Sequence, residues 1–274
     1  MTAPEPVFLK GSAGALFALL VPAQRPGRRG VVLLPPLAEE MNRSRRTLRL
    51  QAAALASLGI TALRLDPFGT GDSEGDFREA RWDTWIADVQ TASAALRANG
   101  AETVGLLGLR LGAVLAAAAA PFLPSASFAT VLWQPVVKGR VHLDEFLRLR
   151  MMPGALHDGR APETVHVLRE CFARQETVEV VGYDVAPEMA AALDSLDLAT
   201  LAHSALGPVT WLDVVRDTML PLLPASRECA EAWRAAGCDV EHRTVAGPAF
   251  WTGQGNAVAT GLIGATTAAF AASP

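Results

Sequence analysis

The chain has 274 residues, half of them hydrophobic and 19% charged, so it can bury a large core as one α/β domain with an insertion. A net charge of -4 gives no electrostatic reason to expect a nucleic-acid partner. The longest apolar stretch, 111–123, is too short to cross a bilayer, and the N-terminus lacks the pattern of a secretory signal. These features predict a cytoplasmic protein without a membrane span.

Strands and helices are expected to alternate along the first half of the chain, judged from apolar periodicity and from glycine or proline breaks. In chain order the pattern predicts a hairpin (7–9 and 15–21), a strand (31–34), a helix (44–58), a strand (61–65), a helix (82–98), a strand (103–107) and a helix (111–120). The helix at 44–58 would begin with a basic run, Arg43, Arg45, Arg46 and Arg49, which we interpret as a solvated face.

The alternation stops after a strand at 127–133 and resumes with a strand at 209–215, a helix at 225–236, a strand at 239–245 and a helix at 257–271. The segment 138–205 is mostly helical in pattern, with one short strand at 178–182. We predict that 138–205 is an inserted cap and that 1–137 and 206–274 form the core. The core is expected to be a doubly wound, mostly parallel sheet that binds ligands at the strand carboxyl ends.

The cysteines and histidines give no metal-binding pattern. The three cysteines are an odd number at spacings that match no zinc motif, which favours structural thiols in a reducing compartment. Four histidines fall in or beside the predicted cap without metal-ligand spacing, and His242 inside the last strand is expected to be a surface or core histidine. We expect no metal and no cofactor. The residues concerned are Cys171, Cys229, Cys238, His142, His157, His166 and His203.

The most informative motif is Gly108-Leu109-Arg110-Leu111-Gly112, which lies between a predicted strand and a predicted helix. This strand-turn-helix context is that of a nucleophile elbow, but the spacing is G-x-R-x-G and not G-x-S-x-G. A guanidinium is a permanent cation with no lone pair to attack a carbonyl. Arg110 can therefore bind or polarise an anion, but it cannot form an acyl-enzyme.

Other segments match parts of α/β-hydrolases. The turn-rich stretch 66–75 resembles their D-x-x-G-x-G-x-S loop, although a plain connecting turn is the favoured interpretation of its residues. Asp217 follows the strand that usually delivers the triad acid, whereas Phe250 stands where the catalytic histidine usually follows the last strand. A Ser-His-Asp triad would thus have lost two of its three members.

Arg110 is expected to lie at the floor of a pocket, where an unpaired buried charge costs about 3–5 kcal/mol. A carboxylate or an anion should therefore be close to it. Glu39 and Glu40, in the loop after the first parallel strand, and Asp217 on the other side are the candidates. Two interpretations stay open: an internal Arg110–Glu40 salt bridge that plugs a dead site, and an anion clamp assisted by helix N-terminal amides.

Taken together, these motifs resemble the exosortase A system-associated hydrolases of the second type, from bacteria that make exopolysaccharide. The matching pieces run along nearly the whole chain and include Pro35-Pro36, Glu39-Glu40-Met41-Asn42-Arg43-Ser44-Arg45-Arg46, Gly75-Asp76-Phe77, Ala80-Arg81-Trp82-Asp83, Gly108-Leu109-Arg110-Leu111-Gly112, Trp133-Gln134-Pro135-Val136 and Gly247-Pro248-Ala249-Phe250-Trp251. The resemblance implies an α/β-hydrolase fold with a cap and a hydrolase label, in or beside an exopolysaccharide and exosortase pathway.

Two functions follow from this combination. The first is an ester or thioester hydrolase in which Arg110 orients an anionic group and Glu40 or Asp217 acts as general base toward water. The second is a non-catalytic protein that binds a metabolite or a protein partner, such as an exopolysaccharide-pathway protein. In either case the residues expected to line the pocket are Leu37, Glu39, Leu111, Gln134, Phe250 and Trp251.

Overall fold

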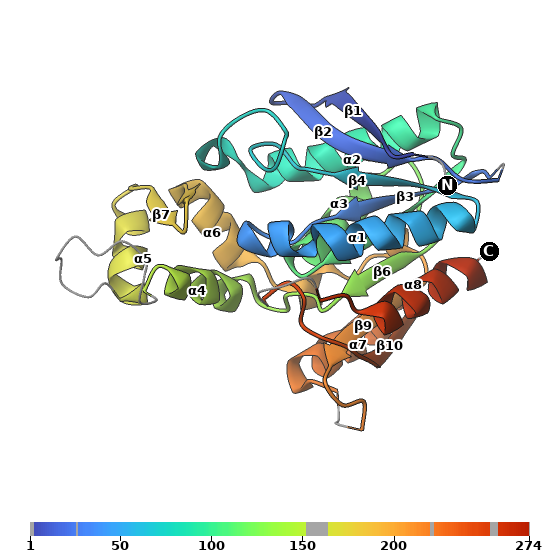
Figure 1. Ribbon diagram of the computed structural model, residues 1–274. Coiled ribbons are helices and arrows are strands. Elements are labelled where there is room, and N and C mark those ends of the chain that lie inside the picture. The colour runs from blue at the N-terminus through green and yellow to red at the C-terminus, as the bar shows by residue number, and fades with distance from the viewer. Residues whose placement is uncertain (1–2, 26, 152–163, 220–221, 253–256, 274) are drawn as a thin grey trace.

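The computed structural model describes residues 3–25, 27–151, 164–219, 222–252 and 257–273, and one mixed sheet runs through it (Figure 1). The sheet has eight strands in the order β1-β2-β4-β3-β5-β6-β9-β10. β2 pairs antiparallel with β1 and β4, and every other pair is parallel. The strands are β1 (Glu5–Lys10), β2 (Ala15–Val21), β3 (Arg29–Leu34), β4 (Ile60–Leu65), β5 (Thr103–Leu109), β6 (Thr130–Trp133), β9 (Val209–Val215) and β10 (Val240–Ala246).

Helices cover both faces of the sheet, as expected for a doubly wound fold. On one face, α1 (Glu39–Ser57) and α8 (Thr260–Ala272) pack on a core that includes Leu33 and Trp133 (Figure 1). On the other face, α2 (Trp82–Ala98), α3 (Leu111–Ala119) and α7 (Pro224–Ala235) contribute to a second core. β3, β5 and β6 are almost wholly buried because both of their faces are covered.

The order of the strands creates a switch point at the centre of the sheet. From β3 the chain moves outward to β4, and it then returns to form β5 on the opposite side of β3. The loops that leave β3 and β5 consequently diverge, which opens a crevice at the carboxyl ends of these neighbouring strands. The predicted elbow follows β5, so the fold places it at this crevice.

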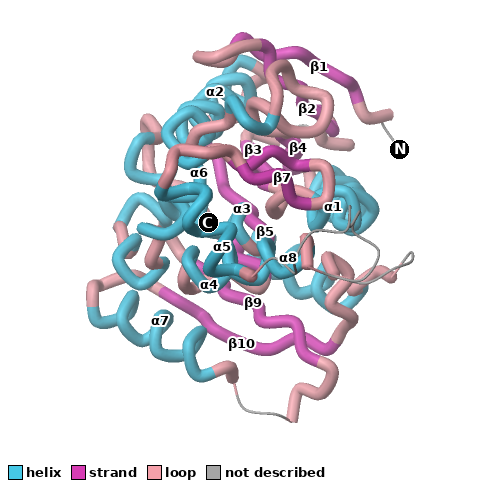
Figure 2. The backbone as a smooth tube through the Cα atoms, turned by 90° about the vertical axis from the view of Figure 1, so that its left-hand side faces the viewer, coloured by secondary structure: helices cyan, strands magenta, loops and turns pink. Residues whose placement is uncertain are grey.

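In the segment between β6 and β9, residues 139–149 and 165–195 lie beyond the carboxyl ends of the central strands (Figures 1 and 2). In place of the single short strand predicted at 178–182, the structure has a hairpin of two strands. The segment holds α4 (Gly139–Leu149), α5 (Val165–Ala173), β7 (Val178–Val180), β8 (Tyr183–Val185) and α6 (Pro187–Ser195), followed by short 3-10 helices at Leu198–Leu201 and Ser204–Leu206. Of the histidines considered above, His157 lies outside the described residues.

The prediction of where the first long helix begins was wrong. α1 begins at Glu39 and not at Ser44, so two acidic residues occupy its first turn and the basic run lies further along the helix. Carboxylates are favourable at this positive end of the helix dipole. Ser44 suits a helix cap in sequence, but its hydroxyl donates instead to the Glu40 carbonyl one turn back.

The polar side chains of the 66–75 loop fasten that loop to the sheet. The Ser73 hydroxyl donates to the Asp66 carbonyl and accepts from the Phe17 amide of β2, and the Glu74 carboxylate accepts from the Ala15 amide. These contacts agree with the interpretation of this stretch as a connecting turn.

Candidate functional site

Arg110 occupies the turn between β5 and α3 with φ 56° and ψ -116°, a conformation that side-chain-bearing residues rarely adopt. The two glycines of the motif allow the turn to be this sharp. A Cβ on Gly112 would lie 2.4 Å from the Pro35 carbonyl oxygen, and one on Gly108 would lie 2.2 Å from that of Gly112. The motif is thus an elbow in geometry, with an arginine at its tip.

The Arg110 guanidinium is held by acidic groups from two different elements. Its Nε lies 3.3 Å from Oε1 of Glu40 on α1, and its Nη2 lies 3.5 Å from Oε2 of Glu145 on α4. The guanidinium carbon also lies 5.9 Å from the centre of the Trp251 ring, within cation–π range. The side chains of Arg110 and Glu40 are only 16% and 19% exposed, so little water screens this pair.

His142 of α4 completes the group. Its Nδ1 lies 3.4 Å from Arg110 Nη2 and 3.8 Å from Glu145 Oε2. Nδ1 accepts from Arg110 when the ring proton is on Nε2, and it donates toward Glu145 when the proton is on Nδ1. Hydrogen bonding to His142, together with the charge of Arg110, lowers the pKa of Glu145. Within the described part of the chain, His142 Nε2 and Glu40 Oε2 are buried without a partner.

A pocket of about 200 Å³ opens beside this cluster; we call it the elbow pocket. Leu37, Phe146, Leu149 and Trp251 supply most of its apolar wall. The charged residues that line it, two arginines against three glutamates, sum to -1 if all are ionised. They are Glu39, Glu40, Arg43, Arg110 and Glu145. The Arg110–Glu40 salt bridge and an open pocket are therefore both present.

A second cavity, of about 230 Å³, also adjoins Arg110, and we call it the α7 pocket. It shares Arg110, His142 and Glu145 with the elbow pocket. Gln134, which follows β6 with φ 42°, lines it and uses its side-chain oxygen to accept from the Val214 amide at 2.7 Å.

The structure brings together only part of the predicted site. Leu37, Glu39, Glu40, Arg110 and Trp251 meet at the elbow pocket, and Gln134 lies at the α7 pocket.

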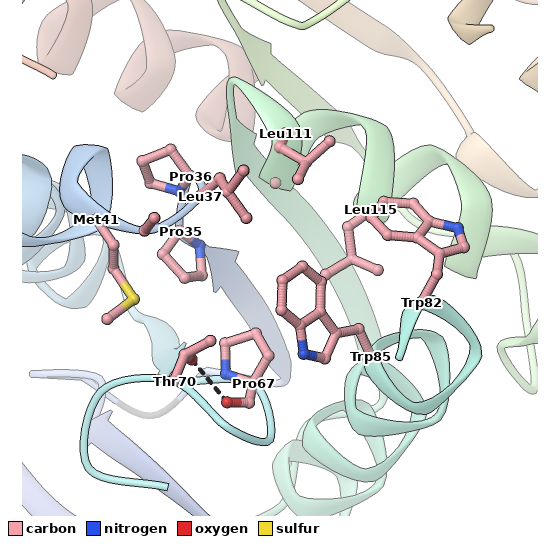
Figure 3. A pocket seen from close by; sticks show the side chains of 12 residues that line it. Pro35, Pro36, Leu37, Met41, Pro67, Thr70, Trp82, Trp85, Leu111 and Leu115 are labelled. Carbon is pink, nitrogen blue, oxygen red and sulfur yellow. Dashed lines mark hydrogen bonds between the residues drawn. The ribbon is translucent and has the colours of Figure 1, made fainter. Parts of the chain in front are cut away.

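The remaining three predicted residues lie elsewhere. Asp217 is exposed and its carboxylate accepts from the Met219 amide; among the described residues it makes no contact with Arg110. Phe250 is 2% exposed and packs edge-on against Trp133. Leu111 lines a separate apolar pocket beside Trp85 (Figure 3), whose volume of about 10 Å³ is close to the minimum for one water molecule.

Sequence reasoning missed the contribution of α4. His142, Glu145 and Leu149 lie on one face of this helix at spacings of three and four residues, and Phe146 lies beside them. That periodicity is visible in the sequence. What the sequence does not indicate is that this face lies over the elbow, because α4 and the elbow are more than 25 residues apart.

A buried imidazole–carboxylate pair lies elsewhere in the sheet. His242 Nε2 of β10 lies 2.9 Å from Asp213 Oδ2 of β9, and their side chains are 1% and 0% exposed. Trp211 donates to the other Asp213 oxygen at 3.0 Å, and His242 Nδ1 has no partner in the described residues. His242 is thus a core histidine, one of the two alternatives expected, and no hydroxyl in the described ranges completes a triad with it.

Two further features bear on the kind of site. Where the structure is described, no group of three or more histidine, cysteine, aspartate or glutamate side chains is arranged to hold a metal ion. No helix in those same ranges is both long and apolar enough to cross a bilayer.

Comparison with known proteins supports the fold. No protein-family model matches the chain, and no curated protein matches it significantly. Among solved structures, the esterase Est1E of Butyrivibrio proteoclasticus, with ferulic acid bound, matches with a TM-score of 0.64 and 14% identity over 96% of this chain and 95% of its own. A hypothetical protein of Pseudomonas aeruginosa gives a TM-score of 0.66 and 16% identity over 97% and 93% of the two chains.

An α/β serine hydrolase homologue of Coxiella burnetii gives a TM-score of 0.55 and 15% identity over 92% of this chain and 90% of its own. Identities this low carry the architecture and not the chemistry. The prediction from the sequence is confirmed at that level: the chain has the α/β-hydrolase fold.

Proposed function

We propose that this protein binds a small, largely apolar molecule in the elbow pocket without forming an acyl-enzyme. The observation that carries the proposal is the state of Arg110, which stands at the tip of the elbow and is engaged by Glu40 and Glu145. Two carboxylates neutralise the guanidinium, so most of its positive charge is compensated within the protein. The pocket beside it remains open and has a mainly apolar wall.

The charge of the elbow pocket narrows the class of ligand. Its ionisable lining sums to -1, which opposes a carboxylate or phosphate placed directly among the glutamates. A neutral ester, thioester or amide with an apolar body fits this lining better. Est1E, which shares the fold, was solved with ferulic acid bound, so methyl ferulate is a rational neutral probe.

Water-dependent hydrolysis of an ester or thioester is the second candidate. It is favoured by Glu40 Oε2, a buried carboxylate oxygen with no partner among the described residues and close to a cation. Such an oxygen has a free lone pair for a water proton, and Arg110 would polarise the carbonyl. Under this alternative, turnover persists in the native protein and is lost in both Glu40→Gln and Arg110→Ala.

The test combines binding with turnover. Methyl ferulate should raise the melting temperature of the full chain in a saturable manner, following RT ln(1 + [L]/Kd), with no product formed from methyl ferulate or from a panel of acyl thioesters. A serine-directed fluorophosphonate should label no residue. Leu149→Trp, which fills the pocket, should abolish the shift, whereas Leu58→Trp on the exposed end of α1 should preserve it.

Two outcomes would reject the binding proposal. An unchanged response in Leu149→Trp would mean that the ligand binds elsewhere, and turnover that disappears in Glu40→Gln would establish the second candidate.

A cytoplasmic role beside exopolysaccharide synthesis and an exosortase system is also part of the proposal, and it rests on the sequence resemblance alone. A deletion strain with unchanged exopolysaccharide would contradict it.

A further inference from the structure

The α7 pocket differs from the elbow pocket in charge, although the two share three residues. Apart from His142, counted as neutral, its ionisable lining is Arg110, Lys138 and Glu145, which sums to +1. Lys138 is also paired with Asp197 at 2.5 Å. Counting Asp197 and Glu40, the partners of its two cations, brings the sum to -1, so an anion there depends on hydrogen-bond donors rather than on net charge.

The N-terminus of α7 opens into this pocket. Leu223, Ala225 and Ser226 line it, and they are the N-cap, second and third positions of a 12-residue helix. No side chain caps this end, and Pro224 at the first position has no amide hydrogen. The amides of Ala225 and Ser226 belong to the first turn, whose amides have no partner within the helix, and the helix dipole adds partial positive charge there.

Two side chains at the pocket have donors to spare. Ser226 is only 4% exposed, and its hydroxyl makes no hydrogen bond within the described part of the chain. Arg110 uses Nε and Nη2 in its contacts with Glu40, Glu145 and His142, whereas its Nη1 makes no hydrogen bond to a described residue. An unbonded hydroxyl on a side chain this little exposed has a donor free for a ligand in the cavity.

We propose that the α7 pocket is a binding site for a compact oxyanion, a phosphate or carboxylate carried by a small molecule, held by Ser226, the α7 amides, Lys138 and Arg110. This goes beyond the proposed function because it concerns a separate cavity and a different ligand chemistry. Pro135, Val136 and Val141 give the rest of the cavity an apolar wall, and about 230 Å³ leaves room for an organic group attached to the anion.

The test uses inorganic phosphate and sodium acetate as probes on the full-length protein, at constant ionic strength, with binding followed by calorimetry and melting temperature. Phosphate should bind saturably if the site accepts a dianion, and acetate alone should bind if it selects a carboxylate. Ser226→Ala combined with Lys138→Gln should weaken binding of the preferred anion about tenfold or more, as expected for lost bonds to a charged group.

The matched control makes the same two kinds of substitution, lysine to glutamine and serine to alanine, at surface residues outside the pocket. Lys10 is the only other lysine, and Ser195 is an exposed serine at the end of α6. The Lys10→Gln, Ser195→Ala double variant should bind within twofold of the unaltered chain. Binding that is equal in both double variants, or absent for both anions, would overturn the proposal.

Failure here is distinguishable from failure of the proposed function. Neither Ser226 nor Lys138 lines the elbow pocket, so methyl ferulate should shift the melting temperature of the Ser226→Ala, Lys138→Gln variant as in the unaltered chain. That shift also shows that the variant is folded.

Discussion

At the scale of single residues, Arg110 combines a strained backbone with a charge that is mostly removed from water. Its positive φ costs on the order of 1–3 kcal/mol, which the surrounding elbow must offset. Its side chain is 16% exposed and depends on Glu40 and Glu145 for compensation. The arginine at the tip of the elbow therefore connects α1, the elbow and α4.

Removing the charge of Arg110 should expose this dependence. Arg110→Met leaves Glu40 partly buried without its cation, and we expect the free energy of unfolding to fall by about 3 kcal/mol. Adding Glu40→Gln should recover part of that loss, because the uncompensated charge disappears. Urea denaturation of the two single variants and the double variant measures the coupling.

Arg78→Met is the control for this cycle. Arg78 pairs with Asp76 at 3.4 Å, but both side chains are more than half exposed, so its loss should cost less than about 1 kcal/mol. Equal destabilisation by Arg78→Met and Arg110→Met would show that the Arg110 ion pairs contribute no more to stability than an exposed ion pair does.

Asp88 predicts a pH dependence of stability. Its side chain is fully buried on α2, one oxygen accepts from the Phe68 amide at 2.9 Å, and the other has no partner among the described residues. Burial raises the pKa of Asp88 from 3.8 to about 6. The folded state thus holds this proton more tightly than the unfolded state, and the stabilisation is complete below pH 3.8 and lost as the pH rises through about 6.

Asp88→Asn should remove this dependence. Relative to the unaltered chain, the variant should gain on the order of 3 kcal/mol in free energy of unfolding between pH 4 and pH 7, since each pKa unit corresponds to about 1.4 kcal/mol. Urea denaturation at several pH values measures the difference. Asp83→Asn, an exposed change on the same helix, is the matched control, and a pH-independent difference between Asp88→Asn and the unaltered chain would contradict the assignment.

At the scale of elements, the elbow depends on close approach between α3 and the end of β3. The hypothetical Cβ of Gly112 meets two backbone oxygens, of Pro35 at 2.4 Å and of Leu34 at 2.5 Å, and backbone cannot move aside as a flexible side chain can. α3 can approach the loop after β3 this closely because residue 112 has no Cβ. The distance between α3 and this loop sets how near Glu40 lies to Arg110.

Gly112→Ala should therefore destabilise the fold by about 1–3 kcal/mol, the usual range for overpacking. Gly264→Ala is the matched control within a helix, because a methyl group added at this position of α8 would have no other atom within 4 Å. It should leave stability unchanged or raise it by up to about 1 kcal/mol. Melting temperatures of both variants give the comparison, and a neutral Gly112→Ala would contradict the steric argument.

At the scale of the whole molecule, a hydrophobic core packs on each face of the sheet. The reactivity of the buried thiol of Cys229 reports whether the core around it opens. Cys229 on α7 is 2% exposed, and burial raises its pKa to about 12 from a usual 9.0. The thiolate is the reactive form of the group. Its population in the folded state is consequently about a thousandfold below that of an ordinary thiol.

Alkylation of Cys229 at pH 8 should therefore follow global unfolding. Iodoacetamide should modify it in the native protein far more slowly than the half-buried Cys238, and the two rates should converge in urea. Peptide mass spectrometry resolves the sites. Fast labelling of Cys229 in the folded state would show that α7 opens independently of the rest of the core.

Local pattern in the sequence determined most of the architecture. Apolar runs and glycine breaks located the strands and helices of the sheet, and the G-x-R-x-G spacing located the elbow, because each depends on neighbouring residues. The beginning of α1 was missed, since Ser44 suits a helix cap as well as a helix interior. The Arg110–Glu40 contact was among the expected alternatives because burying a guanidinium requires a partner.

The tertiary structure alone decided which distant side chains share the site. The positions of His142 and Glu145 beside Arg110 depend on how the segment after β6 folds back over the crevice. Asp217, which follows β9, is exposed and makes no contact with Arg110 among the described residues. The two pockets and their different linings also arise only from that arrangement. Secondary structure follows from interactions between residues a few positions apart. A site, in contrast, is formed by residues that lie far apart in the sequence, and the sequence does not show which of them are close in space.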